Sequence, residues 1–167
     1  RLVVIARDPD PKPAGADSAS SSRPKPIVID RYTFKRDGEG YLDHRRNHLW
    51  LVDVADKKAT QLTTGDYDDS QPRWSPDGSR IAFVSARAGA DPDRENNTDL
   101  FTIDAVVGAA PAALTRWVGD DYGPVWSPDG ASIAYLESNE PKFSAYAQPR
   151  IAVVPSRGGT PVYPAAT

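Results

Sequence analysis

The sequence contains an internal repeat, and this repeat limits the possible fold more than any other feature. Residues 68–78 are matched by residues 120–130, and both segments contain the motif Trp-Ser-Pro-Asp-Gly, at a constant offset of 52 residues. A short apolar run follows each copy, at 80–85 and at 132–137. Self-similarity at a fixed period of this length is typical of solenoids, propellers and other repeat folds.

Each repeat unit is predicted to form four short β-strands. In Ser-Pro-Asp-Gly the proline presets φ at the second position, while aspartate and glycine suit the third and fourth positions of a type I turn between antiparallel strands. A third strand recurs at 49–53, 100–104 and 151–155, and the runs are too short to be helices. Radial four-stranded units of about 40–50 residues predict an all-β fold, a partial β-propeller. A β-sandwich of unrelated hairpins would not require a fixed offset.

The repeat also predicts how the chain is divided. Residues 1–7 align with residues 80–86, so they are expected to be one strand of a preceding blade, and the following linker or loop is rich in Pro, Ser and Ala. The expected segments of this one partial propeller are a strand at 1–7, a linker at 8–24, and blades at 25–63, 71–115 and 123–163. Because propellers close rings of four to eight blades, we expect the remaining blades to lie outside these residues and the end blades to expose apolar faces.

Composition excludes several classes of function. The 167 residues have a formal net charge of −3, which offers no basic surface for nucleic acid, and no apolar stretch is long enough to span a bilayer. The absence of cysteine excludes disulfide scaffolds, zinc fingers and thiol nucleophiles. We therefore expect no nucleic-acid partner, no membrane partner, no cofactor and no metal site, while the compartment, cytoplasmic or periplasmic, stays open.

Residues 26–42, followed by residues 45–54, resemble the propeller of bacterial prolyl oligopeptidase family serine peptidases, of the acylaminoacyl peptidase or dipeptidyl aminopeptidase type. The stretch from Phe34 to Leu42 favours this family over TolB-like propellers, which have nearly the same Trp-Ser-Pro-Asp-Gly repeat. The resemblance implies a separate α/β-hydrolase domain that holds a Ser-Asp-His triad, and a propeller that admits only short peptides. Its implied partners are that domain, the remaining blades and short peptides.

No catalytic machinery is expected within these residues. A Gly-x-Ser-x-Gly nucleophile elbow is missing, and the nearest approach, at 130–134, places Ser132 in a predicted strand. His44 and His48 are interpreted as surface histidines, because Arg45 stands where a zinc-binding helix has its glutamate. Residues 91–97 lack the glycine and glutamate of a calcium loop, and we interpret them as a solvated strand connection.

Several residues recur in register and are interpreted as structural. The aspartate pairs at 68–69 and 120–121 are expected to bind turn amides or hydroxyls of a neighbouring blade, rather than act as a glycosidase-like acid and base. Trp74 and Trp126 are expected to fill the core between blades, and Trp50, matched by Phe101, supports the same interpretation. Trp117 has no counterpart and is expected to be exposed.

The segment around residues 36–41 breaks the repeat and combines charges with glycines, so it is the candidate for contact with substrate. Arg36, Asp37, Glu39 and Tyr41 are the predicted substrate-binding residues. The resemblance implies that charged propeller residues hold a peptide terminus, with Glu39 pairing with an amino group and Arg36 engaging a carbonyl or carboxylate. The alternative is a charged hairpin tip. The expected function is a non-catalytic propeller portion of a serine exopeptidase; the alternative is a TolB-like, non-enzymatic module for protein–protein interaction.

Overall fold

All regular structure in the described part of the chain is β-strand. The computed structural model describes residues 1–9, 26–87, 91, 93–94, 97–138 and 148–164. These residues form antiparallel sheets and contain no helix, so the expected all-β class is confirmed. Accordingly, within these ranges there is no helix long and apolar enough to cross a membrane.

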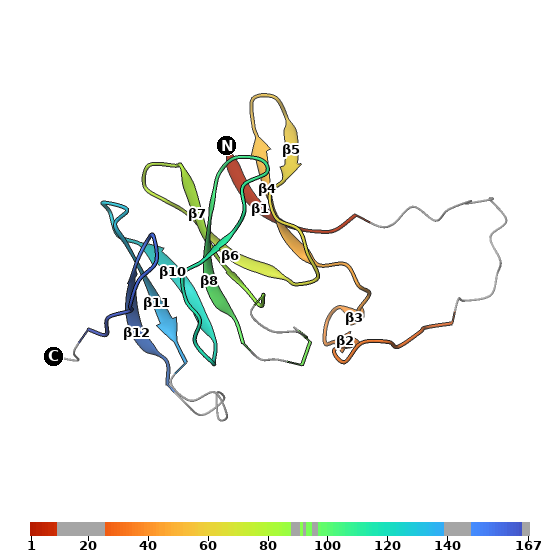
Figure 1. The fold of residues 1–167 in the computed structure, drawn as a ribbon. Helices are drawn as coiled ribbons and strands as arrows, with labels where there is room; N and C mark the ends of the chain where they lie inside the picture. The colour runs from red at the N-terminus through yellow and green to blue at the C-terminus, as the bar shows by residue number, and fades with distance from the viewer. Residues whose placement is uncertain (10–25, 88–90, 92, 95–96, 139–147, 165–167) are drawn as a thin grey trace.

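The central sheet is a complete propeller blade. Its strands follow the order β6-β7-β8-β9 with antiparallel neighbours. They are β6 (Asp69–Trp74), β7 (Arg80–Ser85), β8 (Asp99–Asp104) and β9 (Ala112–Ala113). Figure 1 shows this sheet between two others, which fan out on either side of it. The sequence repeat therefore corresponds to a repeat of sheets in space.

The C-terminal sheet repeats the same arrangement. Its strands are β10 (Asp121–Trp126), β11 (Ser132–Glu137) and β12 (Arg150–Pro155), in the order β10-β11-β12. A bridge between Val153 and Val162 stands at the position of a fourth strand. The register shift between Tyr122 and Val125 matches the shift between Ser70 and Arg73 in the central blade, so even this irregularity is repeated.

The N-terminal sheet differs from the expected division of the chain. Its strands are β1 (Leu2–Arg7), β4 (Asn47–Asp53) and β5 (Lys58–Gln61), in the order β1-β4-β5. Residues 1–7 therefore do not belong to a preceding blade; they pair along their whole length with β4, inside the blade expected at 25–63. Because some 40 residues separate these two adjacent strands, their pairing was hidden in the sequence. That insertion contains the hairpin of β2 (Lys35–Arg36) and β3 (Gly40–Tyr41).

The Ser-Pro-Asp-Gly segments form the predicted turns. The Gly78 amide donates to the Ser75 carbonyl at 2.9 Å, which is the closing hydrogen bond of a β-turn. The Ser75 hydroxyl donates to Asp77 at 2.5 Å and accepts from the Arg80 amide at 2.9 Å, so side chains tie the turn to the strand that follows. Gly78 has a φ of +68°, a left-handed conformation that favours glycine. The second copy has the same bonds.

The apolar core consists of two clusters, one on each face of the central blade. Successive residues of β7 point to opposite faces, so Ile81 and Phe83 join the first cluster while Ala82 and Val84 join the second. The first cluster contains Leu49, Leu51, Leu62, Ile81, Phe83, Phe101, Ile103 and Ala105. The second contains Ala82, Val84, Leu100, Leu114, Ile133, Tyr135, Ala152 and Val154. Blades packed face to face in this way are the arrangement of a propeller.

Tryptophans at the repeated position contribute to these clusters as expected. Trp74 packs against the first cluster and Trp126 against the second. Phe101 also lies in the first cluster, whereas Trp50 belongs to neither. Trp50 pairs with Val4 on the face of the first blade that points away from the central blade. The expectation that Trp50 fills the core between blades was therefore wrong. Phe101, at the equivalent repeat position, has a neighbouring blade on that face, whereas Trp50 has none among the described residues.

Both outer blades present apolar side chains on the face away from the central blade. In the first blade Leu2 is 54% exposed, and in the third blade Val125 and Ile151 are 60% and 59% exposed. In the central blade the equivalent faces are buried by neighbours, so these two faces have the character of blade–blade contacts.

Candidate functional site

The four predicted substrate-binding residues lie on the β2–β3 hairpin. Arg36 ends β2, Asp37 and Glu39 belong to the turn, and Tyr41 ends β3. The guanidinium of Arg36 binds the carboxylate of Glu39 at 2.9 Å, and both side chains are about half exposed, at 51% and 46%. This hydrogen bond raises the pKa of Arg36, so the arginine stays charged. Gly38 has a φ of +84°, which allows the tight turn that brings the two charges together.

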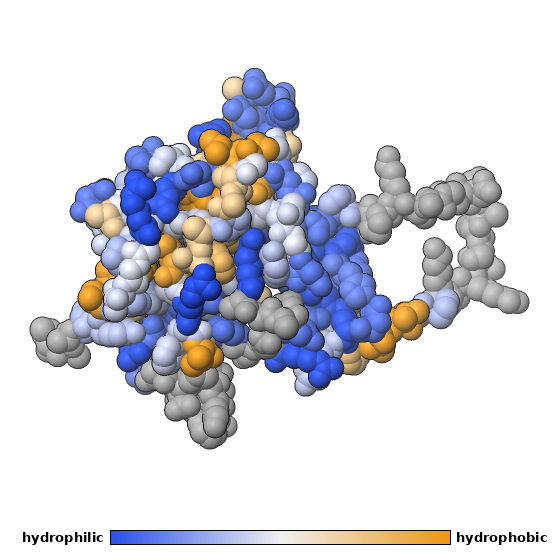
Figure 2. Space-filling view, viewed as in Figure 1, coloured by the Kyte–Doolittle hydropathy of each residue, from blue (hydrophilic) through white to orange (hydrophobic). Residues whose placement is uncertain are grey.

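Tyr41 lies beside another aromatic ring rather than beside the charged pair. Its ring stacks on Phe34 with centroids 6.5 Å apart and the planes inclined by 28°. Tyr41 is 55% exposed and Phe34 is 39% exposed, so the pair presents a small aromatic surface to solvent. In Figure 2 hydrophilic side chains cover the region of the hairpin, and the exposed apolar stretch at residues 27–29 runs up to it.

Ion pairs hold the insertion on the first two blades. The Arg31 guanidinium donates to both oxygens of Asp93, at 2.7 and 2.5 Å, and these side chains are only 9% and 10% exposed. Arg46 donates to Asp93 at 3.1 Å and to Asp66 at 2.7 Å. Burial lowers the pKa of Arg46, but its two carboxylate partners outweigh this and raise the pKa overall. Asp93 therefore links two arginines, and its own pKa is lowered, chiefly by the hydrogen bond from Arg31.

Under the hairpin the ion pairs surround a small recess of about 40 Å³. It is lined by Arg7, Arg31, Arg36, Glu39, Leu42, Arg45, Asn47 and Asp68. A space of this size holds about one water molecule or the head of one carboxylate, and it is too small for a side chain. Guanidinium groups bind carboxylates through paired, charge-assisted hydrogen bonds. The recess can therefore accept an anionic group, while Glu39 at its edge can accept a hydrogen bond from an ammonium group.

The structure brings together two of the four predicted residues. Arg36 and Glu39 line the recess, whereas Asp37 and Tyr41 do not. Arg7 and Arg31 were not among the predicted residues; they reach the recess from β1 and from the segment just before β2. No local pattern marks Arg7, because it is far from the hairpin in the sequence and only the β1–β4 pairing places it nearby. Arg31 lies four residues before β2, but nothing in the repeat distinguishes it.

The two histidines lie in different environments. His44 is exposed and contacts Asp30 at 2.9 Å, as expected of a surface histidine. His48 is 1% exposed, and its ring nitrogens lie 3.4 Å from Asp8 and 3.4 Å from Asp69, so the surface interpretation was wrong for this residue. His48 is buried because β4 places it against Asp69, the first residue of β6 in the next blade.

Three of the four repeated aspartates make structural contacts, although only Asp120 binds a partner of the predicted kind, a hydroxyl of a neighbouring blade. Asp68 accepts a hydrogen bond from the Asn47 amide at 2.7 Å, and Asp120 accepts one from the Thr98 hydroxyl at 3.0 Å, both across blades. Asp69 binds the guanidinium of Arg87 with both oxygens at 2.8 Å. These three residues therefore have structural partners, but the partner of Asp69 is a guanidinium of its own blade, neither a turn amide nor a hydroxyl of a neighbouring blade. Asp121 is different: both of its carboxylate oxygens are buried, and in the part of the chain that the structure describes neither has a hydrogen-bond partner of ordinary geometry.

Two further expectations need correction. Asp93 belongs to the segment that was interpreted as a solvated connection, yet its side chain is buried in ion pairs with Arg31 and Arg46; residues 92, 95 and 96 of that segment lie outside the described residues. Trp117 is partly buried, and its indole nitrogen donates to the Ser138 carbonyl at 2.6 Å. Contacts between neighbouring blades caused both differences.

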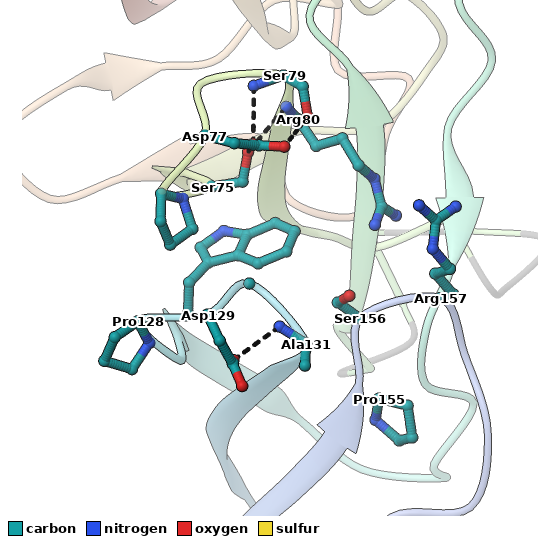
Figure 3. A pocket seen from close by; sticks show the side chains of 13 residues that line it. Ser75, Asp77, Ser79, Arg80, Pro128, Asp129, Ala131, Pro155, Ser156 and Arg157 are labelled. Carbon is teal, nitrogen blue, oxygen red and sulfur yellow. Dashed lines mark hydrogen bonds between the residues drawn. The ribbon is translucent and has the colours of Figure 1, made fainter.

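A groove of about 700 Å³ lies between the Ser-Pro-Asp-Gly turns of the second and third blades (Figure 3). Asp77 and Asp129 stand on its two turns, and each is engaged by hydrogen bonds within its own turn. These bonds lower the pKa of both carboxyls, to about 2 for Asp77. Arg80 and Arg157 lie together at the other side of the groove. The groove therefore combines fixed negative turns with an arginine pair.

The chain is similar in sequence to two bacterial peptidases. The chain is 28% identical over 131 residues to the uncharacterized peptidase YuxL of Bacillus subtilis, covering 78% of this chain and 17% of YuxL. It is 34% identical over 64 residues to dipeptidyl-peptidase 5 of Porphyromonas gingivalis, covering 38% of this chain and 9% of that protein. The chain thus spans less than a fifth of the length of these relatives. No family model matches the sequence.

Solved structures show the same fold. A TolB from Agrobacterium tumefaciens, described as putative, superposes with a TM-score of 0.54 at 19% identity, over 70% of this chain and 40% of that one. Dipeptidyl peptidase 4 of Porphyromonas gingivalis superposes with a TM-score of 0.51 at 18% identity, over 71% of this chain and 15% of that one. The β-propeller class predicted from the repeat is therefore confirmed, and the relatives by sequence are peptidases.

Proposed function

We propose that these residues are the propeller portion of a serine exopeptidase and that they orient short peptides toward a nucleophile in a separate α/β-hydrolase domain. The single observation that favours a peptidase is the sequence similarity to two bacterial peptidases, which extends over 78% of this chain in one case. In this proposal the propeller blades supply the steric barrier, and the packing of their faces by apolar side chains supports it.

The recess under the β2–β3 hairpin is the proposed contact for the peptide. Glu39 receives the free amino group of the substrate, and Arg36 receives a carbonyl or carboxylate oxygen. Both side chains are about half exposed and so can exchange their mutual ion pair for a ligand at small cost. Asp37 and Tyr41, which lie on the same hairpin, contribute at its rim, where the aromatic surface of Tyr41 and Phe34 packs against an apolar residue of the peptide.

The test uses the full-length protein and two short chromogenic peptides, one with a free amino terminus and one acetylated. Glu39→Gln is expected to raise KM for the free peptide about fivefold, the effect of an exposed charge pair worth ~1 kcal/mol, and to leave the acetylated peptide unchanged. Asp56→Asn, an exposed change in the β4–β5 turn, is the matched control and should alter neither KM.

The outcomes separate the two parts of the proposal. Labelling of the full-length protein by a fluorophosphonate, together with peptide hydrolysis, supports the peptidase. A protein that is neither labelled nor active refutes it and favours the TolB-like interaction module, for which the fold likeness to TolB is the supporting observation. Hydrolysis with an unchanged KM in Glu39→Gln refutes the hairpin as the contact while leaving the peptidase assignment in place.

A further inference from the structure

A second pocket, of about 430 Å³, lies between the second and third blades. It opens on the side of the outer strands, between the segment that follows β9 and the segment that follows β12. Its walls include the aromatic side chains of Trp117, Tyr135 and Tyr163, and its polar groups include Asp121 and Glu137. The pocket thus combines aromatic walls with acidic groups and is distinct from the recess under the hairpin.

Asp121 is a buried carboxyl without a partner. Its side chain is 0% exposed, and within the described residues neither oxygen accepts a hydrogen bond of ordinary geometry. The acidic neighbour, Glu137, is satisfied, because it accepts hydrogen bonds from Arg150 and, at 3.2 Å, from the hydroxyls of Tyr135 and Tyr163. A buried ionised group without a partner is strongly unfavourable in a folded protein. Asp121 therefore needs a proton or an external cation.

The preceding blade shows which group belongs opposite this carboxyl. Asp69 stands at the same repeat position, and there Arg87 donates to both carboxylate oxygens at 2.8 Å. The Arg87 guanidinium lies over three rings, with its carbon 4.5 Å from the centroid of Tyr67, 5.3 Å from that of Phe83 and 5.6 Å from that of Phe101. The first interface between blades thus contains a guanidinium held by a carboxylate and aromatic faces.

In the second interface the large side chains of this arrangement are missing. Glycine stands at position 119, the repeat equivalent of Tyr67, and alanine at position 152, the equivalent of Phe101. Position 139, the equivalent of Arg87, is an uncharged asparagine and lies outside the described residues. Tyr135 retains the ring of Phe83. The pocket therefore occupies space that side chains fill at the first interface between blades. The carboxyl of Asp121 remains at the same repeat position as that of Asp69.

The aromatic walls of the pocket already bind a guanidinium at their edge. Arg150 lies 3.9 Å from the ring centroid of Tyr163 and 5.9 Å from that of Trp117, while it donates to Glu137. Arg150 is committed to Glu137 and leaves Asp121 unpaired. The walls are thus suited to a second flat cation stacked against them.

The local charge also favours a cation. Aspartate occupies position 99, where the first interface has His48, so that an acid replaces a base next to the repeated carboxyl. Burial raises the pKa of Asp121 to about 7; the Thr115 hydroxyl lowers this pKa, and the charges of Glu137, Asp99 and Asp120 raise it further. Burial also raises the pKa of Asp99 to about 6. The other ionisable groups facing this cluster are Arg116, Tyr135, Arg150 and Tyr163. Acidic groups outnumber the arginines here.

We propose that the pocket between the second and third blades binds the guanidinium group of an arginine side chain from a peptide or protein. Asp121 accepts the hydrogen bonds that its equivalent accepts from Arg87, and Trp117, Tyr135 and Tyr163 provide the stacking faces. The proposal does not depend on the peptidase assignment, because it concerns binding between blades and not cleavage.

The test measures binding of Nα-acetyl-arginine amide to the full-length protein at pH 8 by NMR or calorimetric titration. Nα-acetyl-citrulline amide, in which a neutral urea replaces the guanidinium, is the matched ligand control, and Nα-acetyl-lysine amide distinguishes a guanidinium from any cation. We expect saturable binding of the arginine compound, at least about tenfold weaker binding of the lysine and citrulline compounds, and a loss of about tenfold or more at pH 5, where Asp121 is protonated.

Protein variants provide a second measurement. Asp121→Asn should reduce binding of the arginine compound at least about tenfold, the loss of one charge-assisted pair of hydrogen bonds. Asp104→Asn, an exposed carboxylate at the other end of β8, should leave it unchanged. Equal affinity for arginine and citrulline amides, or no binding to the wild type, overturns the proposal without any variant; arginine binding that persists in a folded Asp121→Asn protein overturns it as well.

Discussion

Replacement of Asp121 by asparagine should stabilise the protein at alkaline pH and have little effect at acidic pH. The pKa of this carboxyl is raised from an ordinary value of 3.8 to about 7, chiefly by burial. The folded state therefore keeps its proton while the unfolded state releases it above about pH 4, so stability from this group is lost as pH rises from about 4 to 7. A neutral amide removes that loss.

The magnitude follows from the shift in pKa. A difference of about three pKa units corresponds to about 4 kcal/mol, and water in the adjacent pocket screens part of it, so we expect about 2 kcal/mol of stabilisation at pH 8.5. At pH 4 the wild-type carboxyl is protonated, and the two proteins should agree within about 0.5 kcal/mol. Urea unfolding of the full-length protein, followed by tryptophan fluorescence across this pH range, measures both values.

The matched control is the same substitution one blade earlier. Asp69→Asn removes one partner of a buried ion pair and leaves Arg87, whose side chain is 12% exposed, without its carboxylate. We expect this variant to lose about 3 kcal/mol at pH 8.5, opposite in sign to Asp121→Asn. If Asp121→Asn is destabilising at pH 8.5, or if its effect does not change with pH, the description of Asp121 as an unpaired buried acid is refuted.

Two further predictions concern the core and the insertion. Phe83→Ala removes a fully buried ring from the first interface between blades and should cost about 4 kcal/mol of unfolding free energy in urea titrations; a loss below about 1 kcal/mol would show that the blades do not pack there as described. Arg46→Met breaks the ion pairs to Asp66 and Asp93 and should speed amide hydrogen exchange at residues 31–45, while β6–β8 stay protected. Equal exchange rates at residues 31–45 in the variant and the wild type would contradict the role of Arg46 in holding the insertion on the blades.

Much of the fold was predictable because its determinants are local. The Ser-Pro-Asp-Gly turn fixes where two strands meet, as the hydrogen bond from the Gly78 amide to the Ser75 carbonyl shows. Alternation along β7 then sends Ile81 and Ala82 to opposite faces, each covered by another blade. The place of β1 was not predictable in this way, because its partner β4 lies beyond a long insertion and no turn motif joins the two.

The candidate sites were predictable only in part, for the same reason. The glycine-containing hairpin was visible as a break in the repeat, and it brings Arg36 and Glu39 together through a local turn. The recess beneath it needs Arg7 from a different strand, and no sequence pattern indicates that contact.

Repetition in the sequence was sufficient to establish strands, turns and blade class, since these depend on side chains within a few residues of one another. The tertiary structure was needed to show which repeated residues have partners. Asp69 and Asp121 occupy the same place in two copies of the repeat, yet the first is bound by Arg87 and the second is unpaired. Their environments differ in Arg87, which comes from the same blade as Asp69 and has an asparagine at its repeat position in the next blade. They also differ in the residue that the preceding blade places beside each carboxyl, which is His48 in the first case and Asp99 in the second.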